Sequence, residues 1–210
     1  MNRTIWIIAF IFLTASTGVH ALPQDALQEL DEKPSADTKK ATEDEGEDLA
    51  ELTVPGEPHE LLEGTVGEWD LTILVWSAPD TEPAESSGTA SARWILGERF
   101  VETTYEGEVM GRPFEALKIE GFEKATEEYV TTWRDNLGTY TMIFRGRCGG
   151  TCETRTMTAE FLDPVSSAQL TIKGVTTLTE EEGYSYESFI VTPDGGEFKN
   201  MELVAERRSP

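Results

Sequence analysis

Residues 64–76 read GTVGEWDLTILVW, and this stretch decides the fold class. After the Gly-x-Trp near its start, apolar side chains occupy every second position: Trp69, Leu71, Ile73 and Val75. Because side chains alternate between the two faces of a strand, this spacing predicts a β-strand with one buried and one solvated face. The following residues 77–88, SAPDTEPAESSG, are rich in turn formers and predict the end of that strand.

The same two-residue period continues through the rest of the chain. Segments with this period alternate with turn signals, at 88–96, 99–110, 114–122, 128–136, 139–147, 153–161, 168–178, 184–191 and 197–206. A helical turn is expected only within 60–66. Closure of so many short antiparallel strands removes exposed edges. Residues 55–210 are therefore predicted to form an all-β domain, a closed antiparallel up-and-down barrel of about ten strands; a two-sheet sandwich is the alternative.

Residues 1–21 have the layout of a secretory signal peptide. Arg3 precedes a short apolar run, and the segment ends in Val19-His20-Ala21, which fits a small-x-small cleavage site. The apolar run is shorter than the roughly 20 residues of a bilayer span. We expect cleavage after Ala21 and export to the periplasm or the extracellular space. An uncleaved anchor is the alternative, since signal and anchor segments overlap in length.

Residues 22–54 form an acidic segment with eleven Asp or Glu residues and three Lys residues. Without aromatic residues or a sustained apolar period, it cannot bury enough surface to offset the entropy of ordering, so we expect a disordered linker. The whole chain carries a formal net charge of -23. Such a charge disfavours nucleic acid and anionic membrane as partners. No later segment is apolar enough to predict a membrane span.

The Gly-x-Trp at the start of the first strand resembles the calycin superfamily, which includes lipocalins and fatty-acid-binding proteins. The resemblance implies that Trp69 plugs one end of the barrel and that a basic residue of the last strand packs over its indole. Arg207, which shares a strand face with Leu203 and Ala205, is the residue expected there. A cation over an indole face is a favourable contact. Both residues are expected to contribute to stability rather than to chemistry.

The resemblance extends over nearly all of residues 55–208. The motifs PGEPHELL, GEWD, GTASARWILGERF, YEGEVMGRPFE, YVTTWRDN and TPDGGEFKNMEL resemble, in this order, a bacterial family of domains of unknown function, numbered fifteen seventy-nine and grouped with the calycins. This implies a calycin-like barrel, but no activity, ligand or catalytic residue. The chain departs from the family pattern at Glu57-Pro58-His59, where Pro-Glu-His is usual, and in a Cys pair within a hairpin that is normally polar.

That pair, Cys148 and Cys152, lies in RCGGTC, residues 147–152. In an exported protein it is expected to form a disulfide across a hairpin whose turn the Gly residues permit. A zinc site lacks ligands, because His59 is the only imidazole left after signal cleavage. Haem would need axial ligands facing the cavity, and none is recognisable. We therefore expect no metal and no cofactor, and a structural role for His59.

The inward positions of the strands predict the lining of a cavity. They are Trp94, Tyr105, Ile119, Trp133, Met142 and Phe144. An aromatic lining with few hydroxyls suits a small apolar or amphipathic ligand, so a binding module is the first hypothesis. Asp135, near the rim, either fixes the polar end of that ligand or hydrogen-bonds turn backbone. The alternatives are a solid-cored structural or interaction domain and, least favoured, an enzyme, since no acid, base and nucleophile come together.

Overall fold

The computed structural model describes residues 51–149, 152–162, 168–179, 183–192 and 195–209. The predicted signal peptide and residues 22–50 of the predicted linker lie outside the described residues and stay predictions. The last part of that linker is described, and residues 51–53 are helical rather than disordered. Arg99 Nη2 donates to the carbonyl of Thr53 at 2.8 Å, and Lys124 Nζ donates to the carbonyl of Glu51 at 2.8 Å. Two cations of the barrel therefore hold the last residues of the predicted linker.

This boundary can be tested by truncation. A chain that begins at Asp48 should melt at the temperature of the chain that begins at Leu22, because acidic residues without apolar periodicity add no buried surface. A chain that begins at Val54 lacks both hydrogen bonds and should melt about 2–4 °C lower, the effect of roughly 1 kcal/mol in a domain of this size. Calorimetry of the three chains decides. A large loss already at Asp48 would mean that the acidic segment docks on the domain.

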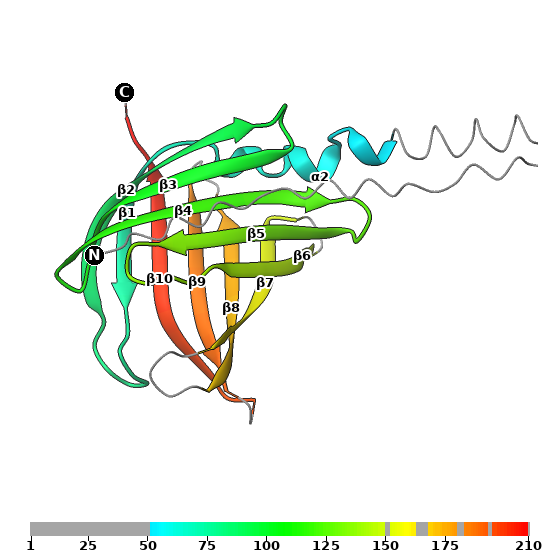
Figure 1. The fold of residues 1–210 in the computed structure, drawn as a ribbon. Coiled ribbons are helices and arrows are strands. Elements are labelled where there is room, and N and C mark those ends of the chain that lie inside the picture. The colour runs from blue at the N-terminus through cyan, green and yellow to red at the C-terminus, as the bar shows by residue number, and fades with distance from the viewer. Residues whose placement is uncertain (1–50, 150–151, 163–167, 180–182, 193–194, 210) are drawn as a thin grey trace, which may run out of the picture. The chain divides into compact units, whose positions relative to one another are not determined.

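Ten strands follow two short helices (Figure 1). The bounds are α2 Glu57–Glu60, η3 Glu63–Thr65, β1 Gly67–Val75, β2 Ala84–Ile95, β3 Phe100–Val109, β4 Arg112–Glu123, β5 Glu128–Asp135, β6 Met142–Gly149, β7 Thr154–Leu162, β8 Gln169–Leu178, β9 Tyr184–Val191 and β10 Glu197–Arg207. Each strand pairs antiparallel with its neighbours in sequence, and β1 pairs with β10, with Trp69 opposite Arg207. The predicted closed antiparallel barrel is confirmed.

The two ends of the barrel differ. At one end, here called the closed end, α2 and η3 lie across the strands, and Leu62 and Thr65 are fully buried there. The hydroxyl of Tyr129 in β5 donates to the carbonyl of Pro58 at 2.9 Å. The opposite end, here called the open end, carries the β1–β2, β3–β4, β5–β6, β7–β8 and β9–β10 connections. The two helices therefore cover one end of the barrel interior.

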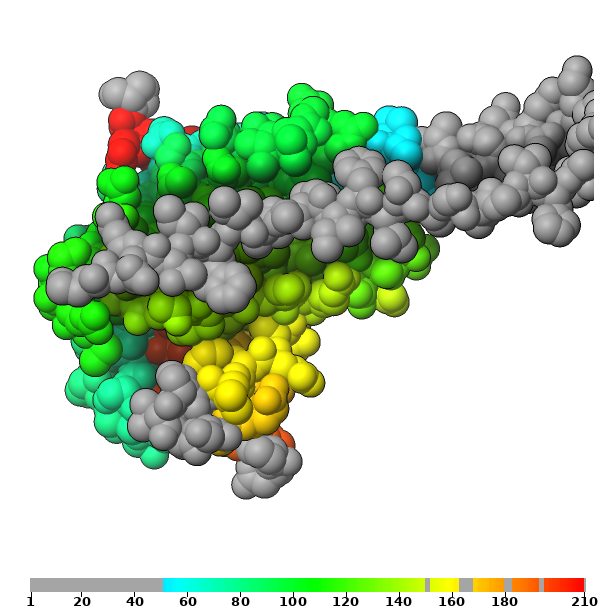
Figure 2. Space-filling model, viewed as in Figure 1, coloured from blue at the N-terminus to red at the C-terminus, as the bar shows by residue number. Residues whose placement is uncertain are grey.

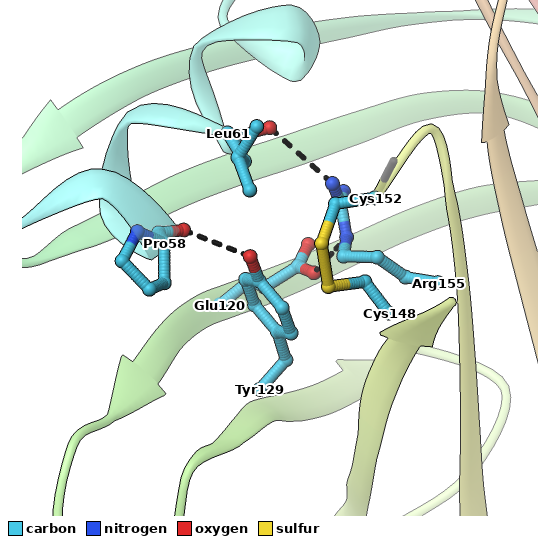
Figure 3. Close-up of a disulfide and its surroundings, with 7 residues drawn as sticks. All are labelled: Pro58, Leu61, Glu120, Tyr129, Cys148, Cys152 and Arg155. Atoms are coloured by element: carbon cyan, nitrogen blue, oxygen red, sulfur yellow. Dashed lines mark hydrogen bonds and ion pairs between the residues drawn. A yellow bond between two sulfur atoms is a disulfide. The ribbon is translucent and has the colours of Figure 1, made fainter. Parts of the chain in front are cut away.

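The predicted disulfide is confirmed. Cys148, in β6, and Cys152 are bonded, with their Cα atoms 4.7 Å apart, and the bond joins the ends of the β6–β7 hairpin at the closed end. The side chain of Arg155 lies beside it, with contacts to Leu61 and Glu120 (Figure 3). A covalent bond therefore ties the strand ends around a buried guanidinium.

One inward face was predicted wrongly. Ile119 was expected to face the interior from residues 114–122, but the buried side chains of β4 are those of Ala116 and Glu120. The register explains the difference, because Tyr105 faces the interior and pairs with Ala116. Residues that pair directly across antiparallel strands share a face, so every second residue from Ala116 points inward. The interior of β4 therefore includes two charged residues, which a hydrophobic pattern does not anticipate.

Candidate functional site

The barrel contains a cavity of about 390 Å³. Every strand except β2 contributes to its lining. Aromatic and aliphatic side chains dominate near the open end, among them Val75, Phe114, Tyr140, Phe161, Ile190 and Met201. Figure 2 shows a recess beside the yellow strand β7, in which deep red atoms of β10 are visible. The interior is therefore hollow and largely apolar.

Strands β6 and β7 separate toward the open end (Figure 1). Their pairing extends from Gly149 opposite Thr154 only as far as Arg145 opposite Thr158. Beyond it, Met142–Phe144 pair with β5 and Ala159–Leu162 pair with β8. The rings of Tyr140 and Phe161 meet edge to face across this separation, with centroids 5.3 Å apart. The described strands thus leave one side of the barrel closed by side chains rather than by backbone pairing.

Five of the seven side chains expected around the cavity line it: Tyr105, Trp133, Asp135, Met142 and Phe144. The other two do not. Ile119 lies on the outer face of β4, for the register reason given above. Trp94 occupies an inward-facing position of β2 but lies near the closed end, where its Nε1 donates to the carboxylate of Glu63 in η3. Alternation along a strand predicts the face of a side chain but not its depth in the barrel.

Trp133 is the centre of the aromatic part of the lining. Its ring centroid lies 5.2 Å from that of Tyr105 and 6.3 Å from that of Phe114. Its Nε1 donates to Asp135 Oδ2 at 2.8 Å. The indole is thus fixed in orientation within the cavity lining, an arrangement that favours contact with apolar ligand groups.

Asp135 lines the cavity, but its carboxylate already has several donors. Besides Trp133, the backbone N–H of Leu137 donates to it at 3.0 Å and the hydroxyl of Tyr140 at 3.4 Å. These bonds tie the β5–β6 connection to the end of β5. The geometry therefore favours the turn-stabilising role over a role as the anchor of a ligand.

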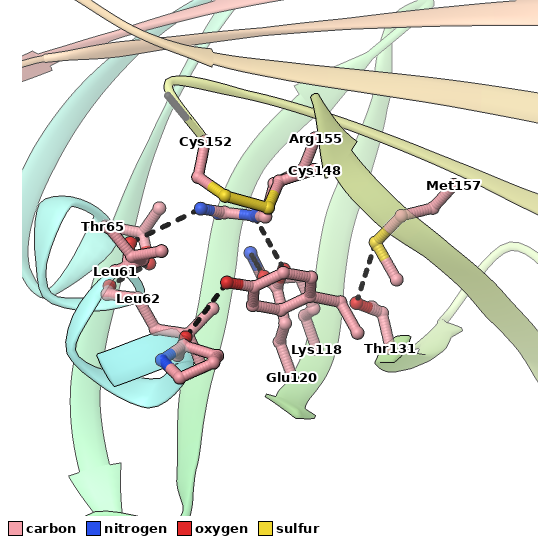
Figure 4. A network of polar contacts seen from close by, with 12 residues as sticks. Leu61, Leu62, Thr65, Lys118, Glu120, Thr131, Cys148, Cys152, Arg155 and Met157 are labelled. Carbon is pink, nitrogen blue, oxygen red and sulfur yellow. Dashed lines mark hydrogen bonds and ion pairs between the residues drawn. A yellow bond between two sulfur atoms is a disulfide. The ribbon is translucent and has the colours of Figure 1, made fainter. Parts of the chain in front are cut away.

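The base of the cavity holds a buried charge cluster, here called the base cluster, made of Lys118, Glu120 and Arg155 (Figure 4). Lys118 Nζ lies 3.1 Å from Glu120 Oε2, and Arg155 Nε lies 3.4 Å from Glu120 Oε1. The side chains of Lys118, Glu120 and Arg155 are only 13%, 4% and 1% exposed. Burial acts to raise the pKa of the Glu120 carboxyl, but the two cations outweigh it and hold the pKa below its ordinary value.

Three tyrosine side chains lie near the base cluster. Tyr105, Tyr184 and Tyr186 line the cavity with Ser188, and Tyr105 and Tyr184 interact through their hydroxyl groups. Burial raises the pKa of all three tyrosines, so they stay neutral donors. None of the base cluster was singled out from the sequence. The strand register could have indicated this cluster. Lys118 and Glu120 occupy inward-facing positions of β4, and Arg155 occupies an inward-facing position of β7, on a face that is otherwise apolar.

The closed end separates the base of the cavity from solvent. Trp69 is fully buried, and the guanidinium carbon of Arg207 lies 4.5 Å from the centroid of its ring. Tyr184 packs against the same indole edge to face at 5.1 Å. Trp69 Nε1 donates to the carbonyl of Thr65 at 3.0 Å. These contacts give Trp69 a packing role between the cavity and the helices.

His59 lies outside the cavity, in α2. Its Nδ1 accepts a hydrogen bond from the N–H of Gly56 at 3.2 Å, and its ring packs edge to face on Phe122 at 5.9 Å. Burial, then the charge of Lys124, lowers its pKa, which keeps the imidazole neutral as an acceptor.

Within the described residues, no three His, Cys, Asp or Glu side chains gather as a ligand set for a metal. In that part of the chain no helix is long and apolar enough to cross a membrane.

The barrel is similar to a solved structure, Rv2717c from M. tuberculosis. The similarity has a TM-score of 0.55 at 14% identity and covers 74% of this chain and 100% of that chain, so it bears on the fold alone. No curated protein matches the chain. The family profile described as "Protein of unknown function (DUF1579)" matches residues 54–207. With its closed ten-strand barrel and that match over most of its length, the chain belongs to the DUF1579 family.

Proposed function

We propose that the protein binds a small apolar or amphipathic molecule inside the barrel. The observation that carries this proposal is the cavity of about 390 Å³, within the range of about 300–1,000 Å³ typical of ligand pockets. Its lining joins an apolar and aromatic majority with a few polar groups at one end, which is the usual composition of such pockets. A solid-cored structural domain would fill this space with side chains, so the cavity supports the binding module over that alternative.

The proposal includes export, as predicted from residues 1–21. The Cys148–Cys152 disulfide supports it, because disulfides persist in oxidising compartments.

Access to the cavity is proposed at the open end, where β6 and β7 separate and only side chains such as Tyr140 and Phe161 close the wall. Side chains rotate far faster than strand pairs break.

Ligand occupancy is tested on protein purified from its native compartment. Native mass spectrometry should show a species heavier than the apoprotein, and solvent extraction should release one small organic compound in a near-equimolar amount. Stripped protein should then bind the neutral fluorescent probe N-phenyl-1-naphthylamine saturably and with one site per chain. A chain that carries nothing from its own compartment and shows no saturable uptake of the probe would refute the proposal.

Trp133→Ala should weaken binding of this probe by about tenfold, since the loss of one aromatic wall removes roughly 1.5 kcal/mol of apolar contact. Trp76→Ala is the matched control. Trp76 follows β1 and stacks with Lys199 Nζ, 5.1 Å from its ring centroid, and it is not part of the lining. Fluorescence titration of both variants gives the comparison. Equal losses in the two variants, or none in either, would contradict a role for Trp133 in the site.

A further inference from the structure

The base cluster has an excess of positive charge. Lys118 and Arg155 share the single carboxylate of Glu120, so the three ionised side chains sum to one positive charge. Two other acids border the cavity, Asp135 and Glu106. Asp135 is engaged by its own donors at the rim, and Glu106 is exposed. Among the described residues, no further carboxylate lies within ion-pair distance of either cation of the cluster.

The accessible part of this charge is the ammonium of Lys118. Lys118 lines the cavity, whereas Arg155 lies behind it, held at the closed end by the carbonyl of Leu61 and the ring of Tyr129. An ammonium group has three N–H donors. In the described part of the chain Lys118 Nζ hydrogen-bonds only Glu120, which leaves two donors for a bound molecule. Because β4 is paired on both sides, the backbone that carries this group is fixed.

Neutral donors accompany the ammonium. Tyr184 and Tyr186 are close enough to Lys118 for its charge to lower their pKa values, although burial, the larger effect, raises them. Tyr105 also lines the cavity, and its hydroxyl interacts with that of Tyr184. Hydrogen bonds from neutral and charged donors to one anion in a water-poor site are among the stronger polar contacts in proteins.

We propose that the base of the cavity binds the carboxylate head of an amphipathic monoanion, with Lys118 as its ion-pair partner and the apolar chain directed toward the open end. This inference rests on the proposed function, since it assumes that the cavity takes a ligand. A buried charge without a partner is costly, so an anion that neutralises it is favoured. A phosphate head carries about -1.5 to -2 charge at neutral pH and overcompensates the cluster, whereas one carboxylate balances it.

The test compares two probes of equal chain length, dodecanoate and dodecanol, by calorimetric titration at pH 7.5. The protein should bind dodecanoate at least about tenfold more tightly than dodecanol, because hydrogen bonds to charged groups outweigh those to a hydroxyl. In Lys118→Met the affinity for dodecanoate should fall to that for dodecanol, while the affinity for dodecanol changes less than about threefold. Lys118→Arg should retain the preference for dodecanoate, since it keeps the charge.

Lys173→Met is the matched control, because Lys173 stacks on Phe189 and pairs with Glu197 away from the cavity. It should bind both probes as the unaltered protein does. Equal affinity for the two probes in the unaltered protein would overturn the carboxylate site and leave the binding cavity standing. If neither probe binds, the proposed function falls together with this inference. The comparison in the unaltered protein needs no variant, so a Lys118→Met chain that fails to fold does not prevent a decision.

Discussion

Trp69→Ala is expected to lower the free energy of unfolding by about 3–5 kcal/mol, the range for truncating a large buried aromatic residue. The indole is fully buried between the helices and the cavity, it packs on Tyr184, and its Nε1 is bonded to Thr65. Its removal also leaves the carbonyl of Thr65 without that donor. Urea denaturation followed by circular dichroism gives the value. Trp76→Ala, a change of the same residue type at a partly buried position just after β1, should cost much less.

Arg207→Ala should cost less, about 1–2 kcal/mol, because the exposed guanidinium contributes its contact with the ring and a hydrogen bond of 3.3 Å from Nη1 to the carbonyl of Val66. Since the two side chains touch, the double variant should lose less than the two single losses added together. A strictly additive result, or a Trp69→Ala chain as stable as the control, would show that the indole does not hold the closed end together.

The Gly-x-Trp motif shows what a sequence pattern can and cannot reveal. The motif and the two-residue period were enough to predict the barrel, because each strand has one consistently apolar face and the loops between strands are short. The reason for the glycine appears only in the structure. Gly67 has a φ of +137°, and a Cβ there would lie 2.5 Å from Arg207 Nη1. The contact joins the first strand to the last, so a local pattern does not contain it.

The candidate site was harder to predict than the fold. Five lining residues could be predicted from the alternation of side chains along a strand, because in β3, β5 and β6 the predicted inward positions are the ones that face the cavity. In β4 the face with Leu117 and Ile119 lies outside, and the face with Lys118 and Glu120 lies inside. Charged residues are buried there because Arg155, from a distant strand, completes the ion pairs. The hydrophobicity pattern of one strand does not reveal that a residue of another strand will pair with its buried charges.

Glu120→Gln is expected to destabilise the barrel by about 3–5 kcal/mol at pH 7, the usual cost of removing one member of a buried ion pair. The variant leaves Lys118 and Arg155 as two buried cations without a carboxylate. The double variant Lys118→Met/Glu120→Gln removes one of these cations and should therefore recover part of the loss. Glu123→Gln, on the same strand, is the control, because its pair with Arg145 is solvent-exposed, and the change should have little effect.

The effect of Glu120→Gln should also depend on pH, with a defined sign. The folded state holds the pKa of Glu120 below its ordinary value, which is about 4.3 in an unfolded chain. The carboxylate therefore contributes its full stability above that pH, and the contribution is lost as the pH falls through the folded pKa. Denaturation midpoints from pH 7 down to pH 3 should show the unaltered protein losing its advantage over Glu120→Gln below about pH 4.3. A stability difference that grows with acid would mean that Glu120 is protonated in the folded barrel, and the base cluster would then carry two positive charges for an anion to balance.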